Sequence, residues 1–185
     1  LDGNQRLTEE QALEIARALD EWGWAWFEEP IPQRDVLGYA RLNAAVSMPI
    51  TGGESRTTLQ QLAPYLEEDA YAIVQCDGGC CGITEGLRIG RAAHELGIGM
   101  CPHNWHNGLM TMANAHLVAA LPDPMVLELC MIQGPLQWEI LEQMPAIRDG
   151  YLELPDAPGL GVALSEDLEK RFPYIEGHYA VQVER

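Results

Sequence analysis

Three acidic residues recur at equal intervals in the first part of the chain. Asp2, Glu28 and Glu54 are each separated from the next by 26 residues. If each interval holds one strand and one helix of a parallel βα fold, the three side chains stand beside one another at the carboxyl ends of neighbouring strands. Three converging carboxylates keep their charges only near a cation, and an oxygen-only ligand set suits Mg²⁺. The spacing therefore predicts a magnesium site.

The middle carboxylate of this series is one of an adjacent pair. Glu28 and Glu29 follow the aromatic and apolar run 24–27 directly, and Pro30 ends the segment. Successive side chains of a strand point to opposite faces of the sheet. We therefore predict that Glu28 is a metal ligand and that Glu29 points the other way, as an outer or structural partner of the site.

Three further ionisable residues lie on apolar segments later in the chain. Asp77 and His103 each end such a segment, and Glu128 lies on the last one. The carboxyl ends of all strands in a parallel βα fold lie on one face, which is where such folds carry their active sites. We expect these residues to meet the three carboxylates on that face.

Short apolar segments alternate with helical patterns along the chain, at intervals of about 25 residues, which is typical of an α/β fold with a parallel sheet. The predicted strands are 24–29, 49–54, 72–77, 98–103 and 125–129. The predicted helices are 8–23, 35–46, 57–66, 84–96, 109–120 and a short acidic one at 165–171.

Local signals refine these elements. Thr8 and Gln11 fit a capping box at the start of the first helix, and Gly23 suits its end. The glycine-rich stretch GGCCG at 78–82 is predicted to be a turn. Trp24 and Trp26 occupy alternate positions of a predicted buried strand, so we expect them to pack in the core rather than to stack against a sugar.

The composition argues against several classes of function. The chain has 185 residues, enough for one domain with a real core, and its 28 acidic and 11 basic residues give a net charge of −17. Nucleic acids and anionic membrane surfaces need clustered basic side chains, so we expect neither as a partner. No apolar run approaches the roughly 20 residues of a membrane span, and the first residues do not form a signal-peptide pattern.

The cysteines indicate a reducing compartment. The chain has five cysteines, an odd number, and the adjacent pair Cys80 and Cys81 does not have the spacing of a zinc site. We predict reduced, mostly buried thiols and a cytoplasmic protein.

Several motifs together resemble the enolase superfamily, and within it the mandelate racemase group of the mandelate racemase and muconate lactonizing enzyme family. The motifs are DGNQ at 2–5, WFEEP at 26–30, GGE at 52–54, QCDGGCCGIT at 75–84, PHNW at 102–105 and LPDAPGLGV at 154–162. They are spread over essentially the whole chain and occur in the order and spacing of that family.

The resemblance implies a (β/α)7β-barrel, a TIM-type fold, with a separate capping domain. On this pattern residues 1–150 form a partial barrel, from the end of the third strand to the eighth, and residues 151–185 return towards the capping domain. The first strands and the capping domain would lie outside the chain. We therefore expect a C-terminal fragment with open edges at 24–29 and 125–129, which is insoluble or molten and inactive when expressed alone.

The resemblance also implies roles for the ionisable residues. The Mg²⁺ ligands of the family fall on the three equally spaced carboxylates. Its catalytic histidine falls on His103, the aspartate that orients this histidine falls on Asp77, and the acid that hydrogen-bonds the developing enolate falls on Glu128. The residues expected to line the substrate pocket are Asn4, Asn104, Trp105 and His106.

Two departures from the family pattern stand out. The turn between Asp77 and Ile83 is one residue shorter than usual, which bears on the register between Asp77 and His103. The basic Lys-x-Lys motif of the family, which lies one strand before Asp2, is not within the chain.

The chemistry implied is removal of the proton next to a carboxylate, followed by dehydration of a sugar acid. Muconate-lactonizing relatives carry a lysine at the end of the sixth strand, and residues 70–82 contain none. A racemase needs a second base on the opposite face of the substrate. Dehydration of an aldonate or aldarate is therefore favoured, with racemisation, epimerisation and cycloisomerisation as alternatives. A small-molecule carboxylate is the expected partner, and the full-length protein is expected to be a homo-oligomer; an inactive half-barrel is the non-enzymatic alternative.

Overall fold

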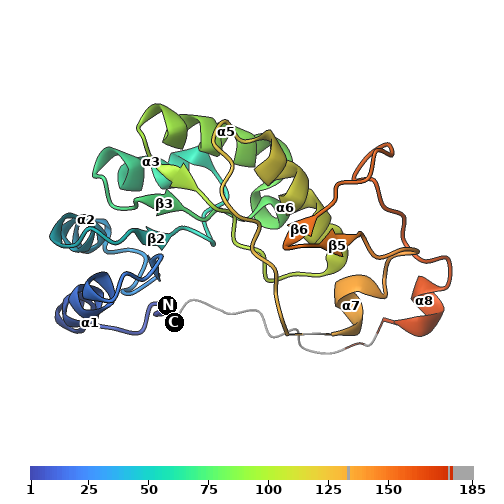
Figure 1. The fold of residues 1–185 in the computed structure, drawn as a ribbon, viewed down its shortest axis with the longest axis horizontal. Helices are drawn as coiled ribbons and strands as arrows, with labels where there is room; N and C mark the ends of the chain where they lie inside the picture. The colour runs from blue at the N-terminus through green and yellow to red at the C-terminus, as the bar shows by residue number, and fades with distance from the viewer. Residues whose placement is uncertain (133, 175, 177–185) are drawn as a thin grey trace.

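A parallel sheet forms the core of the N-terminal part of the computed structural model, which describes residues 1–132, 134–174 and 176 (Figure 1). The strands lie side by side in chain order: β1 (Phe27–Glu28), β2 (Ile50–Gly52), β3 (Ile73–Val74) and β4 (Gly99–Met100). The register sets Glu28 opposite Thr51, and Val74 opposite both Gly52 and Met100. All four carboxyl ends therefore lie at one edge, and the predicted α/β fold with a parallel sheet is confirmed.

Five long helices alternate with the strands, and the first of them precedes β1. They are α1 (Glu9–Glu21), α2 (Val36–Ala45), α3 (Leu59–Glu67), α5 (Ile83–Glu95) and α6 (Gly108–Ala120). Figure 1 shows them arranged around the outer side of the curved sheet, and each contacts the next in this series. The predicted capping box is present, because Thr8 and Gln11 exchange both hydrogen bonds at the start of α1. Gly23, with φ +69°, lies just beyond its end.

The core lies between the sheet and these helices. Phe27, Ile50 and Val74 of the strands are fully buried, and Leu62 of α3 and Ile89 of α5 are buried in the same cluster. Burial of a side chain of this size stabilises a fold by about 1.5 to 3 kcal/mol. The core therefore fixes the position of each strand, and with it the residues that follow each strand.

Strand β1 is shorter than the predicted segment 24–29. Phe27 is buried, whereas Trp24 lies ahead of the strand and is 45% exposed. The prediction that both tryptophans pack in the core is therefore wrong for Trp24. Trp26 is half-buried, and its indole N–H donates to Glu28 Oε2 at 3.4 Å.

The edge of β1 that was predicted to be open is occupied by the start of the chain. Glu28 N–H donates to the Leu1 carbonyl and Gly3 N–H donates to the Glu28 carbonyl, each at 2.8 Å. This bridge sets Asp2 parallel to Glu28 in the adjacent row. The prediction of an open β1 edge is therefore wrong, whereas the expected adjacency of Asp2 and Glu28 is present.

The predicted turn at 78–82 contains a short helix, α4 (Gly78–Cys81). Asp77 caps it, since its Oδ1 accepts the Gly79 N–H at 2.7 Å. This local hydrogen bond helps a glycine-rich segment to form a helical turn here. It also fixes one carboxylate oxygen of Asp77 next to the backbone.

Residues 125–129 do not form the predicted strand. The backbone N–H of Asn104 donates to the Glu128 carboxylate at 2.6 Å, and the Asn104 side chain donates to the Glu128 carbonyl at 2.8 Å. Side chains thus occupy the groups that a ladder of backbone hydrogen bonds would use. The segment is held beside the chain that follows β4, but it is not a fifth strand.

The C-terminal region adds two short helices and a hairpin. They are α7 (Pro135–Trp138), the antiparallel strands β5 (Ile147–Arg148) and β6 (Tyr151–Leu152), and α8 (Leu168–Arg171). The hairpin crosses residue 150, the predicted limit of the barrel part. Of the predicted segment 151–185, residue 175 and residues 177–185 lie outside the described part of the chain.

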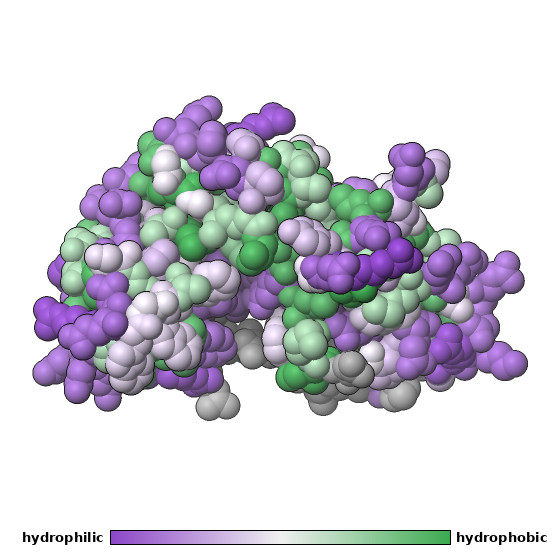
Figure 2. Space-filling model, in the orientation of Figure 1, coloured by the Kyte–Doolittle hydropathy of each residue, from purple (hydrophilic) through white to green (hydrophobic). Residues whose placement is uncertain are grey.

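Several large apolar side chains are exposed to solvent. Figure 2 shows hydrophobic surface towards the middle of this face and hydrophilic surface at both outer ends. Met131, Ile132 and Tyr151 are 71 to 76% exposed. None of the described helices combines the length and the apolar character that crossing a membrane requires.

Candidate active site

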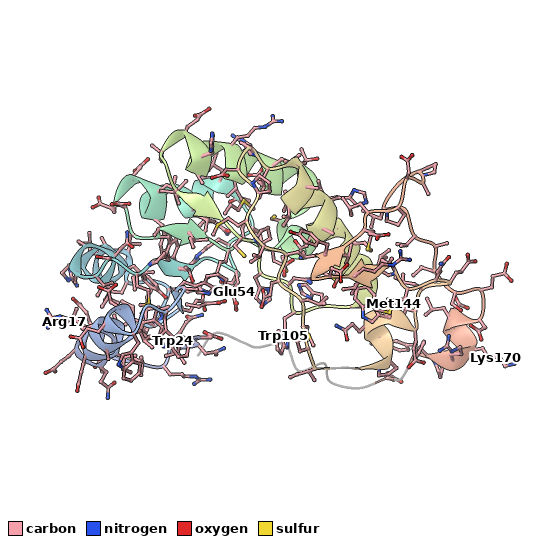
Figure 3. All side chains as sticks on the ribbon, in the orientation of Figure 1. Arg17, Trp24, Glu54, Trp105, Met144 and Lys170 are labelled. Atoms are coloured by element: carbon pink, nitrogen blue, oxygen red, sulfur yellow. The ribbon has the colours of Figure 1, made fainter. Side chains whose placement is uncertain are left out.

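Four of the predicted site residues lie at or just beyond the carboxyl ends of the four parallel strands. Glu28 is the last residue of β1 and Glu54 lies two residues beyond β2. Asp77 and His103 each lie three residues beyond their strands, β3 and β4. Figure 3 shows Glu54 in the middle of the molecule. The sheet thus gathers on one edge residues that are far apart in sequence.

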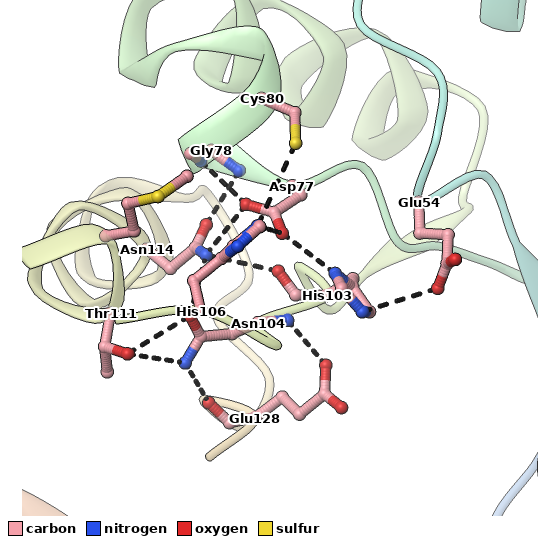
Figure 4. Close-up of polar contacts among 12 residues, drawn as sticks. Glu54, Asp77, Gly78, Cys80, His103, Asn104, His106, Thr111, Asn114 and Glu128 are labelled. Carbon is pink, nitrogen blue, oxygen red and sulfur yellow. Dashed lines mark hydrogen bonds and ion pairs between the residues drawn. The ribbon is translucent and has the colours of Figure 1, made fainter. Parts of the chain in front are cut away.

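A histidine and an aspartate form the best-defined pair of the site (Figure 4). His103 Nδ1 donates to Asp77 Oδ2 at 2.8 Å, and His103 Nε2 lies 3.5 Å from Glu54 Oε2. Burial lowers the pKa of His103, but the hydrogen bond to Asp77 and the charge of Glu54 outweigh it and raise the pKa to about 9. The Nε2 atom is therefore the one available for proton transfer.

Asp77 is fully buried. Burial alone would raise the pKa of this carboxyl group, but hydrogen bonds from His103 and Asn114 outweigh it and hold the pKa below the ordinary value. A buried carboxylate that keeps its charge fixes the tautomer of the imidazole bound to it. The shorter turn after Asp77 leaves the bond to His103 intact.

Asn114 of α6 forms hydrogen bonds with both residues of this pair, a role that was not predicted. It is fully buried; its Nδ2 lies 3.1 Å from Asp77 Oδ1 and 3.1 Å from the His103 carbonyl, and its Oδ1 accepts the Gly78 N–H at 2.7 Å. The signal in the sequence is a pair of polar residues, Thr111 and Asn114, three positions apart on a mostly apolar helix.

The predicted metal carboxylates are crowded by negative charge. Burial raises the pKa of Glu28, and the charge of Asp2 raises it further. Burial also raises the pKa of Glu54, to about 7, with added effects from the charges of Glu29, Glu28 and Asp2. A divalent cation is the group that relieves such repulsion.

The donor set of these three residues fits Mg²⁺ by its chemistry. All donors are carboxylate oxygens, as a hard cation prefers. Their ligand atoms do not all lie within 4.8 Å of one another, because among the described residues only Asp77, Cys80 and His106 form such a group. Holding an ion therefore requires the three carboxylates to move closer, and their ligand role stays a prediction.

Glu29 is turned away from this cluster into a buried network. It is 2% exposed; its Oε2 accepts from Gln5 Nε2 at 2.8 Å, and its Oε1 accepts from Gln33 Nε2. The Gln5 N–H also donates to the Glu29 carbonyl at 2.7 Å. Glu29 therefore points away from the predicted metal site and has a structural role, as strand alternation predicts.

Replacing Glu29 by alanine is expected to destabilise the fold by about 3 kcal/mol, because the buried amide of Gln33 and the partly buried amide of Gln5 lose a charged acceptor. Urea unfolding followed by circular dichroism measures this change. Glu21→Ala, at an exposed position at the end of α1, is the control and should change stability little. Equal stability of the two variants would show that the Glu29 network contributes nothing to folding.

Glu128 reaches the site from the segment that was predicted to be a strand. Its Oε2 accepts the Asn104 N–H, and its charge contributes to the raised pKa of both His103 and Glu28. Asn104 is fully buried, and its amide also contacts the Thr111 hydroxyl at 3.1 Å. Asn104 therefore packs against Glu128, and its role in lining a substrate pocket stays a prediction.

The other predicted pocket residues occupy different surroundings. Asn4 is exposed and donates its backbone N–H to Asp2 Oδ1 at 2.7 Å. Trp105 is 52% exposed. His106 lies 2.6 Å from Asp77 through its Nε2, so Asp77 Oδ2 contacts two imidazoles, a feature that was not predicted.

Curated relatives match nearly the whole chain. Arabinonate dehydratase of Saccharolobus solfataricus is 34% identical over 174 residues, 93% of this chain and 46% of its own length. D-galactarolactone cycloisomerase of Agrobacterium fabrum is 29% identical over 181 residues, 93% of this chain and 48% of its own length. The chain thus spans about half the length of the curated relatives it matches.

Solved structures match the fold closely. A Bordetella bronchiseptica RB50 protein in complex with 2-oxoglutarate/phosphate matches with a TM-score of 0.90 and 31% identity over 95% of this chain and 48% of its own. L-talarate dehydratase from Polaromonas sp. JS666, in complex with Mg and L-glucarate, matches with a TM-score of 0.80 and 27% identity over 91% of this chain and 45% of its own.

The comparisons agree on one family. A family model described as enolase C-terminal domain-like matches residues 1–168. The similar proteins include sugar-acid dehydratases and a cycloisomerase. The chain therefore belongs to the enolase superfamily, as a C-terminal domain of the mandelate racemase and muconate lactonizing enzyme type.

Proposed function

We propose that the protein carrying this chain is a Mg²⁺-dependent dehydratase of a sugar acid, an aldonate or aldarate. The observation that carries the proposal is the His103–Asp77 pair, whose free Nε2 faces Glu54 at the edge where Glu28 also ends its strand. A base beside a group of carboxylates that favours a cation is the arrangement needed to remove a proton next to a substrate carboxylate. The relatives that are sugar-acid dehydratases support this choice of substrate class.

The residues of the chain perform the proton transfers. His103 Nε2 removes the proton from the carbon next to the substrate carboxylate, while Asp77 holds Nδ1 and balances the charge of the protonated ring. The raised pKa of His103 favours the protonated form, so the same ring can then give a proton to the departing hydroxyl. Glu128, placed by Asn104, is proposed to hydrogen-bond the developing enolate when it is protonated.

Asp2, Glu28 and Glu54 are proposed to hold the ion. When bound, Mg²⁺ would supply electrostatic stabilisation of the negative charge that develops on the substrate carboxylate. The substrate loses one proton from C2 and the hydroxyl from C3, which leaves as water. The resulting enol becomes a ketone, so the product is a 2-keto-3-deoxy acid.

The test is a product assay on the full-length protein with a panel of aldonates and aldarates. Mg²⁺-dependent formation of a 2-keto-3-deoxy acid is the expected result. A change of configuration without a ketone would replace the proposal by racemisation or epimerisation. Isomerisation of a sugar lactone would replace it by cycloisomerisation, which the similarity to D-galactarolactone cycloisomerase makes the second candidate.

Asn114→Ala is expected to lower kcat about 100-fold, because Asp77 and His103 lose the buried amide that positions them and small misplacements are costly to catalysis. Steady-state kinetics of the full-length variant measure this loss, with KM changing much less. Asn43→Ala, which removes a surface hydrogen bond to the Asp69 carbonyl, is the matched control. Unchanged kcat in Asn114→Ala would show that α6 does not position the pair.

A further inference from the structure

A second group of possible metal ligands includes Asp77 but none of the three carboxylates assigned to Mg²⁺. Among the residues that the structure describes, Asp77, Cys80 and His106 form a group whose ligand atoms all lie within 4.8 Å of one another. His106 Nε2 lies 2.6 Å from Asp77 Oδ2 and 3.9 Å from Cys80 Sγ (Figure 4). The group contains one sulfur, one imidazole nitrogen and one carboxylate oxygen.

We propose that Asp77, Cys80 and His106 form a binding site for a thiophilic divalent cation of the Zn²⁺ class, separate from the three carboxylates assigned to Mg²⁺. Thiolate and imidazole ligands select Zn²⁺ over Mg²⁺, whereas all-carboxylate sets favour Mg²⁺. Three protein ligands leave a fourth tetrahedral position to water or another small ligand.

The geometry of the group is close to what the ion needs. Neighbouring nitrogen and oxygen ligands about 2.0 Å from a tetrahedral Zn²⁺ lie about 3.3 Å apart, and a thiolate lies slightly farther from them. The Cys80–His106 separation of 3.9 Å already approaches this value, and the Asp77–His106 contact of 2.6 Å must open by less than 1 Å. The ion therefore replaces one hydrogen bond without a large movement of the backbone.

The surrounding residues fix the position of Asp77 and leave the group accessible to an ion from solvent. Asp77 is fixed through its other oxygen, Oδ1, by Gly79 and Asn114, so that Oδ2 faces the group. Cys80 is exposed and the His106 side chain is 25% exposed, so an ion reaches both from solvent. Burial and the charge of Asp77 raise the pKa of the Cys80 thiol, so binding must displace its proton.

Binding at this group would act on the pair that performs proton transfer. Asp77 Oδ2 contacts both His103 and His106, so a cation on this oxygen withdraws negative charge from His103. Zn²⁺ should therefore inhibit turnover without displacing Mg²⁺ from the carboxylates. This second part of the inference rests on the proposed function, whereas the binding itself does not.

Binding is tested with the metal ions alone. Purified protein is titrated with Co²⁺ to detect the thiolate-to-metal charge-transfer absorption, and then with Zn²⁺ in competition with a chromophoric chelator. Cys80→Ser should abolish the absorption and weaken Zn²⁺ binding at least about 100-fold, and His106→Asn should weaken it at least about 10-fold. The matched controls Cys81→Ser and His94→Asn should bind as the unchanged protein does. Loss of the absorption in Cys81→Ser, or equal Zn²⁺ affinity in Cys80→Ser and the unchanged protein, would overturn the site.

A kinetic experiment tests the coupling of the Zn²⁺ site to turnover separately from the proposed dehydratase activity. With any activity that the full-length protein shows, Zn²⁺ inhibition should weaken at least about 10-fold in Cys80→Ser, while the effect of Mg²⁺ stays the same. Equal inhibition of the two proteins by Zn²⁺ would refute the coupling to His103. Failure of the dehydratase assay leaves the Co²⁺ and Zn²⁺ titrations as a complete test of the site.

Discussion

His103→Asn is expected to lower kcat of the full-length protein by about 10³- to 10⁴-fold, which is the upper part of the range for loss of a general acid–base group. Asparagine keeps a polar side chain that can still donate to Asp77, so the local fold should persist. It has no group that takes up and releases a proton at the position of Nε2. Steady-state kinetics at saturating substrate and Mg²⁺ measure the loss.

Two measurements make this prediction specific. Mg²⁺ affinity, determined by isothermal titration calorimetry, should change less than about 3-fold, because His103 is not among the three carboxylates. His94→Asn, on the outer helix α5, should keep full activity. Near-normal turnover of His103→Asn would place the base elsewhere in the full-length protein.

Glu28→Gln is expected to weaken Mg²⁺ binding at least about 100-fold, because the site loses one of three negative charges and a strong oxygen donor. The amide keeps the size of the side chain and can still accept from the Trp26 indole, so the strand should be preserved. Calorimetric titration with Mg²⁺ measures the change, and the Mg²⁺ concentration needed for half-maximal activity should rise in parallel.

Glu21→Gln removes one negative charge from an exposed position. It is the control for the effect of net charge on Mg²⁺ affinity. If both variants lose Mg²⁺ affinity equally, the ion responds to net charge and not to a site at Glu28. If Glu28→Gln binds Mg²⁺ normally, the three-carboxylate assignment is wrong.

The repeating part of the fold was predictable because its signals are local. The capping box at Thr8 and Gln11 and the caps at Asp35 and Thr58 lie next to the helices that they begin. The interval from Glu28 to Glu54 corresponds to one helix and one strand, so the adjacency of their strands follows from sequence spacing. The contact between Asp77 and His103 follows in the same way from the pairing of β3 with β4.

The parts that could not be predicted depend on contacts between distant side chains. Residues 125–129 have the apolar pattern of a strand, but Asn104 binds Glu128 in place of a backbone ladder. Asn114 lies on a mostly apolar helix in the sequence. Only the packing of α6 against α4 in the folded structure brings its side chain to Asp77. His106 is a loop residue by pattern, and only the folded structure shows that it contacts the same oxygen as His103.

The very short strands determine where the protein can accept inserted residues. Each of the four parallel strands has only two or three residues, and each is followed within three residues by Glu54, Asp77 or His103, or ends in Glu28 itself. One residue inserted in such an interval turns the following side chain to the opposite face of its strand or lifts it out of its layer. Insertions in the connections between helix ends and the next strand leave these intervals unchanged. The short intervals between these strand ends and the site residues are therefore the places where the chain accepts inserted residues least.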